Sequence, residues 1–444
     1  MKIFLIGMSG IGMQGLAILA KKQGYEVSGF DDNEKSKYLQ NFEIKYDENF
    51  SEKTDFVIFS SAIKPDHILI KAAKIAGIPC LNRTDFLLNH IKFNSNLILV
   101  AGAHGKTTTS SFIAYIFGLK SYLIGGIING ETGPANCSED KFSIIETDES
   151  DGSFLKWSAK IPASGAKNYK ILTTFDFEHM DHFKTEENIT AAFQKYIFDN
   201  LENSVVIIEK AAYDSLEVAK MAEKMNLSTK NIITFSNQKY CLETKTTADF
   251  VFHDLEFEST GLKFKINEKL IQIPLFGEHN ASNFTAIYAL LNHLGTPYET
   301  VQNRIENFPG IKKRLQKITQ KNEFTIFSDY GHHPKEISAV LAAFTLHKKH
   351  KPDVIIEMHR YTRLQYTWLE WPKILKGYKV FLLPIHSANE APIEGISIEN
   401  LIVFLQKNGI EAEFLPDFNQ FSPQNDTICF SAGKLSSLLD KIEK

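Results

Sequence analysis

The sequence predicts an α/β protein with parallel sheets, divided into three domains. Apolar runs typical of buried strands, such as Lys2 to Ile6 and Leu97 to Ala101, alternate with helical apolar spacing, as in Gly15 to Lys22 and Thr108 to Phe117. This alternation favours helices packed on parallel sheets. The 444 residues are too many for one hydrophobic core, and a typical length of about 150 residues per domain suggests about three domains.

The composition indicates a globular protein without a nucleic-acid or membrane partner. Hydrophobic residues make up 43% and charged residues 23% of the chain, and the net charge of −4 disfavours binding to a phosphate backbone. No apolar run approaches the roughly 18 residues that a membrane-spanning helix needs. The four cysteines are scattered without a close pair, so neither a disulfide framework nor a zinc site is expected. These features favour the cytoplasm.

Two breaks in the pattern predict the domain boundaries. A mostly polar stretch, His90 to Asn96, precedes a fresh strand and a second glycine-rich turn. Pro309 and Gly310 separate a helical stretch from a new set of strands. We therefore expect domains at 1–95, 96–309 and 310–444. Alternating residues between about 248 and 274 suggest antiparallel strands attached to the middle domain.

The first glycine-rich turn has the spacing of a dinucleotide-binding loop. Gly10, Gly12 and Gly15 follow the first strand and open a helix, so the backbone can approach a diphosphate. Asp31 and Asp32 follow the next strand, where a carboxylate can accept hydrogen bonds from a ribose. This pattern alone is weak. The glycines could serve only tight packing, and bound NAD is a competing interpretation.

The second turn is a sharper signal for phosphate binding. The strand that ends at Ala101 leads into a glycine loop and then a helix, which is the setting of a P-loop. Lys106 can reach the β- and γ-phosphate oxygens, and Thr107 can ligate Mg²⁺. The full Walker pattern has glycine where Val100 stands here, so this loop is short. The expected phosphate-binding residues are Gly102, Ala103, His104, Gly105, Lys106, Thr107 and Thr108.

This short loop and the motifs that follow it resemble the Mur ligases over nearly the whole chain. The matching segments, in order, are GAHGKTTT at 102–109, ETDESDGSF at 146–154, EHMD at 178–181, GEHNASN at 277–283, GIKKR at 310–314, DYGHHP at 329–334 and HRYTR at 359–363. So many ordered motifs make the resemblance specific.

The resemblance implies a Rossmann-like N-terminal domain that binds UDP, a central P-loop ATPase-type domain and a Rossmann-like C-terminal domain. It implies an ATP- and Mg²⁺-dependent ligase that joins L-alanine to the carboxylate of UDP-N-acetylmuramate in peptidoglycan precursor synthesis. In that mechanism ATP phosphorylates the carboxylate, and the amine attacks the resulting acyl phosphate. All partners would be small molecules.

The resemblance also assigns roles to individual residues. The catalytic set is Lys106, Glu146, His179 and Arg314, and the metal ligands are Thr107, Glu146 and His179. Outside the loop, the nucleotide set is His279, Asn280, Asn283, Arg314 and Asp329. The UDP-sugar set is Gly10, Ile11, Gly12, Asp31, Ser60, Ser61 and Arg83, and the amino-acid set is His359, Arg360 and Arg363.

Simpler interpretations compete with several of these roles. The two asparagines could cap a helix. Asp148, Glu149 and Asp151 could form a solvated acidic turn. Arg360 and Arg363 could form a surface basic cluster. Zinc at His332 and His333 is disfavoured, because adjacent side chains point apart and no third ligand of suitable spacing follows.

Some positions depart from the family pattern and bear on the choice of amine. They are Thr174, Phe177, Lys313 and Ser328, together with a long spacing between Glu146 and His179. That spacing resembles family members that attach a whole tripeptide during murein recycling, whereas GHHPKEI and HRYTR favour L-alanine. We expect L-alanine, with the tripeptide as the alternative. An NAD-dependent dehydrogenase and an inactive nucleotide-binding protein are the alternatives of other classes.

Overall fold

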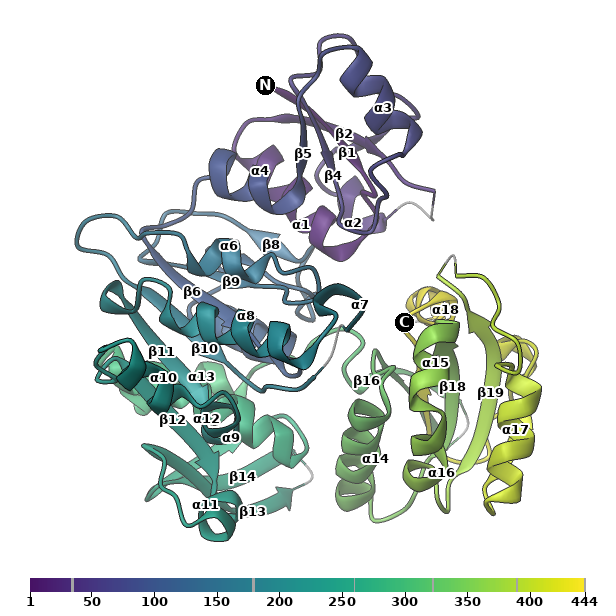
Figure 1. The fold of residues 1–444 in the computed structure, drawn as a ribbon. Coiled ribbons are helices and arrows are strands. Elements are labelled where there is room, and N and C mark those ends of the chain that lie inside the picture. Colours follow the sequence, from purple (N-terminus) through teal and green to yellow (C-terminus); the bar gives the residue numbers. More distant parts are fainter. Residues whose placement is uncertain (33–35, 178–179, 259, 322, 389, 443–444) are drawn as a thin grey trace. The chain divides into compact units, whose positions relative to one another are not determined.

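The computed structural model describes residues 1–32, 36–177, 180–258, 260–321, 323–388 and 390–442. In this part of the chain the strands form three sheets flanked by helices (Figure 1), so the α/β prediction is confirmed. The chain divides into two compact units. The first unit comprises Met1–Asp254, Phe264–Ile273 and Asn280–Pro309, and the second comprises Leu255–Lys263, Pro274–His279 and Gly310–Lys444. The two domain boundaries expected from the sequence stay predictions.

The first sheet is parallel, with strand order β3-β2-β1-β4-β5. The order reverses between β1 and β4, and ligands of such sheets bind beyond the carboxyl ends of the strands at this reversal. The strands are β1 (Lys2–Ile6), β2 (Glu26–Phe30), β3 (Lys45–Tyr46), β4 (Phe56–Phe59) and β5 (Cys80–Asn82). The helices are α1 (Ile11–Lys22), α2 (Lys37–Gln40), α3 (Ile68–Ile75) and α4 (Arg83–His90).

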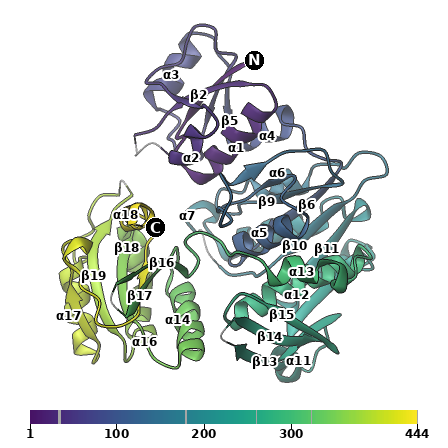
Figure 2. The ribbon, with the colours of Figure 1, turned by 180° about the vertical axis from the view of Figure 1, so that it is seen from behind.

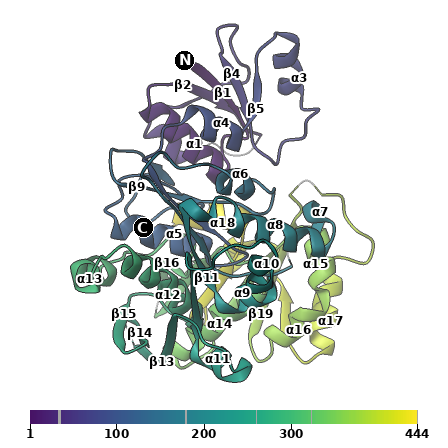
Figure 3. The same cartoon turned by 60° about the vertical axis from the view of Figure 1, so that its left-hand side comes forward.

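Alternate residues of β1 point to opposite faces of this sheet, which explains its continuous apolar sequence. Ile3 and Leu5 pack with α1 and α4, whereas Phe4 and Ile6 pack with α3. Helix α1 also contacts the second sheet, because a Cβ atom at Gly15 would lie 2.3 Å from a methyl carbon of Leu123. Helix α1 therefore lies between the two sheets of the first unit (Figure 3).

The second sheet has the order β15-β14-β13-β12-β11-β10-β6-β9-β7-β8. Its strands are β6 (Asn96–Ala101), β7 (Tyr122–Leu123), β8 (Ala135–Asn136), β9 (Phe142–Glu146), β10 (Asn168–Leu172), β11 (Ser204–Glu209), β12 (Ile232–Asn237), β13 (Phe250–Glu258), β14 (Gly261–Ile266) and β15 (Lys269–Ile273). Strand β6 pairs in parallel with β9 and β10. The extension expected to be antiparallel begins differently, because β13 pairs in parallel with β12.

Helices cover both faces of this sheet. Figure 1 shows α6 (Phe154–Ser158) and α8 (Glu186–Phe198) on one face, and Figure 2 shows α5 (Lys106–Ile116), α12 (Glu278–His293) and α13 (Tyr298–Glu306) on the other. Phe112 in α5 stacks on Phe308, which follows α13, with 4.3 Å between the ring centroids. This contact packs α5 against the end of α13. The remaining helices are α7 (Met180–Phe183), η1 (Leu201–Asn203), α9 (Lys210–Ser215), α10 (Val218–Lys224) and α11 (Gln238–Thr244).

The third sheet, in the second unit, has the order β16-β17-β21-β18-β19-β20. Its strands are β16 (Gln316–Lys321), β17 (Phe324–Asp329), β18 (Asp353–His359), β19 (Lys379–His386), β20 (Glu411–Phe414) and β21 (Thr427–Phe430). Strands β16 and β17 pair antiparallel, whereas β17–β21, β21–β18, β18–β19 and β19–β20 are parallel pairs. The helices are α14 (Pro334–Lys348), α15 (Tyr361–Thr367), η2 (Trp368–Glu370), α16 (Trp371–Ile374), α17 (Ile398–Lys407), η3 (Phe418–Gln420) and α18 (Lys434–Ile442).

One buried charge lies inside the first unit. The side chain of Lys170, in β10, is fully buried, and its Nζ donates hydrogen bonds to the backbone oxygens of Tyr196, at 3.0 Å, and Asp199. Burial disfavours the charged form and lowers the pKa of Lys170 to about 7, although the charge of Asp199 opposes the shift.

The burial of Lys170 predicts a pH-dependent contribution to stability. Its pKa is about 7 in the folded chain and 10.5 without perturbation. Between these values the unfolded chain binds more protons, so the free energy of unfolding rises with pH, by at most about 1.4 kcal/mol per pH unit. Below pH 7 both states are protonated and the contribution is constant. The free energy of unfolding, measured with denaturant at several pH values in this window, should rise less steeply with pH for Lys170→Met than for the wild type. An equal rise with pH in the two proteins would contradict the assignment.

Candidate active site

The phosphate loop joins the end of β6 to the start of α5. Gly102 and Gly105 have φ angles of +132° and +84°, which favour glycine. A Cβ atom at Gly102 would lie 2.9 Å from backbone atoms of Thr174, and one at Gly105 would lie 2.3 Å from Oδ1 of Asn283. The backbone N–H of His104 donates to Oγ1 of Thr174 at 2.9 Å. The loop is therefore held between the end of β10 and helix α12.

Lys106, the first residue of α5, lies with its ammonium group inside this loop. Its Nζ donates to the backbone oxygen of Gly102 and to Oε1 of Glu149, each at 2.7 Å. Burial acts to lower the pKa of Lys106, but the charges of Glu149 and Asp148 outweigh it and raise the pKa. Lys106 is thus held as a cation where phosphate oxygens are expected.

Glu149 is a residue whose importance the sequence analysis missed. Its side chain is only 2% exposed, so it does not belong to a solvated acidic turn. The available signal was its place three residues after Glu146, directly beyond a buried strand. Asp151 differs, because its Oδ1 accepts a hydrogen bond from the backbone N–H of Ser153 at 2.9 Å and so shapes the local turn.

Glu146 and Thr107 form a pair of oxygen donors beside the loop. Glu146 is the last residue of β9, and its Oε1 accepts a hydrogen bond from Oγ1 of Thr107 at 2.8 Å. Its Oε2 accepts from Ser110, at 3.1 Å, and from the backbone N–H of Gly125, at 2.6 Å. A Cβ atom at Gly125 would lie 2.5 Å from Oε1 of Glu146, so glycine there leaves room for the carboxylate.

A carboxylate and a hydroxyl fit a hard cation such as Mg²⁺, which keeps several water ligands and needs few from the protein. The third expected ligand, His179, lies outside the described residues. Among the residues that are described, no group of three or more His, Cys, Asp or Glu side chains is arranged to hold a metal ion. The fit therefore depends on Thr107 and Glu146 alone.

Asn280 and Asn283 lie inside α12, which begins at Glu278, and not at its N-cap. Both are nearly buried, with 9% and 7% exposure, and Nδ2 of Asn283 donates to Oδ1 of Asn280 at 3.2 Å. Asn283 also contacts Gly105 across the loop, as the glycine geometry shows. A simple capping role does not explain these contacts. Ala103, His104 and Thr108 are half-buried in the same turn.

The first glycine-rich turn lies at the strand reversal of the first sheet. A Cβ atom at Gly12 would lie only 1.8 Å from Nη1 of Arg83, so the guanidinium covers this turn. Ser60 follows β4, and its Cβ lies 3.2 Å from where a Cβ atom of Gly7 would stand. Asp31 has a structural role that the sequence analysis missed, because its Oδ2 accepts the backbone N–H of Ser9 at 2.7 Å.

The structure thus places five of the seven expected UDP-sugar residues, namely Gly10, Gly12, Asp31, Ser60 and Arg83, around one turn. Ile11 begins α1 directly after Gly10, and Ser61 is exposed beside Ser60. Burial acts to raise the pKa of Asp148, but Lys106, the hydrogen bonds of Ser150 and, last, the positive charge of Arg83 together lower it. Arg83 therefore lies against the glycine turn and close enough to the acidic segment after β9 to act on its charge.

In the second unit, Asp329 and Arg314 lie together. Asp329 ends β17 and is 3% exposed, and its carboxylate accepts the backbone N–H groups of Leu315, at 2.8 Å, and Gly331, at 2.7 Å. Burial raises the pKa of Asp329 to about 6, whereas the charge of Arg314 opposes the shift. The guanidinium carbon of Arg314 lies 5.7 Å from the ring centroid of Tyr330.

His279 belongs to the same unit as Arg314. Much of its side-chain surface is exposed, yet the dense surroundings of the ring and, second, the charge of Arg314 lower its pKa to about 4. His333 caps α14 in a capping box with Glu336, which is a structural role.

His359, Arg360 and Arg363 gather where β18 ends and α15 begins. Nη1 of Arg363 lies 2.9 Å from Nδ1 of His359. Arg360 is exposed and has a φ of +68°, and its backbone N–H donates to the backbone oxygen of His386 at 2.9 Å. Two guanidinium groups in one turn can bind a carboxylate.

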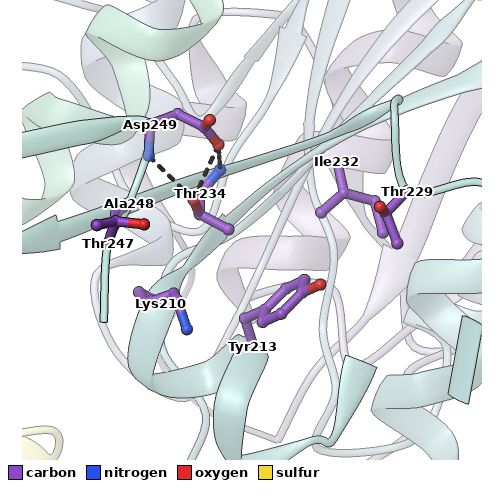
Figure 4. A pocket seen from close by; sticks show the side chains of 8 residues that line it. All are labelled: Lys210, Tyr213, Thr229, Ile232, Thr234, Thr247, Ala248 and Asp249. Atoms are coloured by element: carbon purple, nitrogen blue, oxygen red, sulfur yellow. Dashed lines mark hydrogen bonds between the residues drawn. The ribbon is translucent and has the colours of Figure 1, made fainter. Parts of the chain in front are cut away.

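A separate pocket in the first unit contains none of the expected residues. Figure 4 shows its lining, which comprises Lys210, Tyr213, Thr229, Ile232, Thr234, Thr247, Ala248 and Asp249. The backbone N–H and Oγ1 of Thr234 donate to Oδ2 of Asp249 at 2.7 and 2.9 Å, so these polar groups bind each other.

Within the described residues, no helix combines the length and apolar character needed to cross a membrane.

Two protein-family models and many known proteins match this chain. Residues 2–94 match the model "Mur ligase family, catalytic domain", and residues 100–291 match "Mur ligase middle domain". A UDP-N-acetylmuramate--L-alanine ligase from Carboxydothermus hydrogenoformans is 31% identical, covering 95% of this chain and 91% of its own, and one from Dictyoglomus turgidum is 32% identical, covering 99% and 92%.

Solved structures share the fold. The UDP-N-acetylmuramate-alanine ligase of Thermotoga maritima superimposes with a TM-score of 0.78 at 22% identity, covering 100% of this chain and 98% of that one. A murein peptide ligase from Psychrobacter arcticus superimposes with a TM-score of 0.71 at 19% identity and the same coverage. With relatives above 30% identity over nearly its whole length, this chain belongs to the Mur ligase family.

Proposed function

We propose that this chain is an ATP-dependent ligase that joins L-alanine to the carboxylate of UDP-N-acetylmuramate in peptidoglycan precursor synthesis. The observation that carries the proposal is similarity over nearly the full length to relatives named for that reaction. The substrates are small molecules. We place the reaction in the cytoplasm, where ATP is available and where the free cysteines stay reduced.

The phosphate loop supplies the site for ATP. The backbone N–H groups of Gly105 and of the first residues of α5 are the donors for the phosphates, because those of Ala103 and His104 already donate to Thr174. Lys106 offsets the charge on the transferring phosphoryl group. Thr107 and Glu146 would hold Mg²⁺, which would supply positive charge to offset the negative charge of the phosphates. His179 is proposed as a further ligand from the family resemblance alone. Asn280, Asn283 and His279 bind the nucleoside part.

The reaction proceeds through an acyl phosphate. A carboxylate oxygen of the muramic acid attacks the γ-phosphorus, the bond to the β–γ bridging oxygen breaks, and ADP leaves. The amine nitrogen of alanine then attacks the acyl carbon, loses a proton and expels phosphate, which carries the former carboxylate oxygen. Arg314 stabilises the transferring phosphoryl group. Asp329 holds the segment that carries Arg314, because it accepts the backbone N–H of the next residue, Leu315.

The remaining two sites bind the ends of the substrates. The glycine turn at Gly10 and Gly12, covered by Arg83, binds the UDP diphosphate, with Ser60 and Ser61 beside it. His359, Arg360 and Arg363 bind the α-carboxylate of alanine. No observation on this chain favours NAD as the ligand of the first turn, since the phosphate loop and Glu146 would then have no use.

Replacing the charged groups of the phosphate site should abolish most turnover. We expect Lys106→Ala and Glu146→Ala each to lower kcat by about a hundredfold or more, because each removes stabilisation of phosphoryl transfer. Asp151→Ala is the matched control, since its carboxylate shapes only the following turn. Phosphate release measured on variants with wild-type circular dichroism tests this, and near-normal turnover in folded Glu146→Ala would mean that the metal site is misplaced.

The choice of amine can be tested by competition. Phosphate release should require ATP, UDP-N-acetylmuramate and an amine together, because an acyl phosphate is useful only when it is sheltered and captured. With free L-alanine and L-Ala-γ-D-Glu-meso-diaminopimelate at equal concentration, mass spectrometry should find L-alanine incorporated. Preferential incorporation of the tripeptide would overturn the amine assignment but leave the ligase assignment intact.

A further inference from the structure

Three imidazole rings lie in a row at the carboxyl edge of the third sheet. The ring of His359 is 5.6 Å from that of His332 on one side and 5.4 Å from that of His386 on the other, measured between centroids. The His359 and His386 rings are stacked, with 27° between their planes. His359 ends β18 and His386 ends the neighbouring β19, where the two residues are register partners. The sequence analysis did not select His386.

The middle imidazole acts as a hydrogen-bond acceptor. Arg363 can only donate, so the 2.9 Å contact from its Nη1 requires a lone pair on Nδ1 of His359. His359 is therefore neutral, with its proton on Nε2. Burial, followed by the neighbouring His332 and Arg363, lowers the pKa of His359 to about 3, which agrees with this state. The plane of the His359 ring thus sets the direction of the Arg363 guanidinium.

His386 contacts the groups that place both arginines. Its ring stacks on His359, and its backbone oxygen accepts the N–H of Arg360. That hydrogen bond restrains a residue with a φ of +68°, a backbone conformation that residues other than glycine keep only when their surroundings hold them.

The position of the His386 ring is itself fixed by packing. A Cβ atom at Gly433 would lie 2.6 Å from Cγ of His386 and 2.7 Å from Oε2 of Glu357. The same Glu357 oxygen accepts from Oγ of Ser431 at 2.5 Å. The ring is therefore packed against the loop after β21 on one side and against His359 on the other.

We propose that His386 is a positioning residue for recognition of the incoming amino acid, acting through His359 and Arg363 on the α-carboxylate. The proposal rests on the proposed function, which assigns that carboxylate to Arg360 and Arg363. A flat ring at position 386 holds the His359 plane, and the His359 acceptor holds the guanidinium. Without the ring, Arg363 rotates more freely and loses part of its charged hydrogen bond to the substrate.

The test compares His386→Ala, which removes the ring, with His386→Phe, which keeps a flat ring. We expect His386→Ala to raise the KM for L-alanine about tenfold, a part of the ten- to 150-fold range of a lost charged hydrogen bond, and to leave the KM for ATP unchanged. His386→Phe should stay within about threefold of the wild type. His350→Ala is the matched control, because His350 precedes the opposite end of β18.

A double-mutant cycle with Arg363→Ala separates positioning from general damage. If His386 acts through Arg363, adding His386→Ala to Arg363→Ala should raise the KM for L-alanine little further. An unchanged KM in folded His386→Ala, or fully additive effects, would overturn the proposal. Should His386→Ala not fold, His386→Gln against His386→Phe decides, since only the latter keeps the ring. Wild-type turnover with L-alanine tests the proposed function independently of these ratios.

Discussion

The proposed phosphate site depends on the buried ion pair between Lys106 and Glu149. An ammonium group inside a glycine loop loses most of its water, and that loss costs several kcal/mol unless a partner offsets it. Glu149, 2% exposed and 2.7 Å away, is that partner, and the carbonyl oxygen of Gly102 takes a second hydrogen bond. Removing one member of such a pair typically costs about 3–5 kcal/mol, so Glu149 is the main partner that stabilises the charged lysine in the loop.

In the second unit, the proposed functional groups lie at the carboxyl ends of neighbouring parallel strands. Asp329, His359 and His386 end β17, β18 and β19. Contacts within the protein restrain each of these side chains. Asp329 accepts two backbone N–H groups, and the His359 and His386 rings stack on each other. Restraint of this kind orders a site before its ligand arrives, which lowers the entropy cost of binding.

The sequence was sufficient wherever the determinant is local. The strand, glycine loop and helix around Lys106 are adjacent in the chain, and so are His359, Arg360 and Arg363, so both sites could be predicted. It was insufficient where the determinant is a partner distant in sequence. The burial of Glu149, the support of His104 by Thr174 and the stacking of His386 on His359 depend on which strands become neighbours. Asp31 is a further example of a distant partner, because its carboxylate accepts a hydrogen bond from the backbone N–H of Ser9.

In the proposed mechanism, ATP activates the muramic acid carboxylate as an acyl phosphate before the amine attacks. The most direct measurement uses UDP-N-acetylmuramate labelled with ¹⁸O in the carboxylate, together with ATP, Mg²⁺ and L-alanine. Because the carboxylate oxygen that bonds to phosphorus leaves with it, the account predicts one ¹⁸O atom in each released phosphate, seen as an isotope shift in the ³¹P spectrum. Phosphate released without the label, alongside normal amide formation, would contradict it.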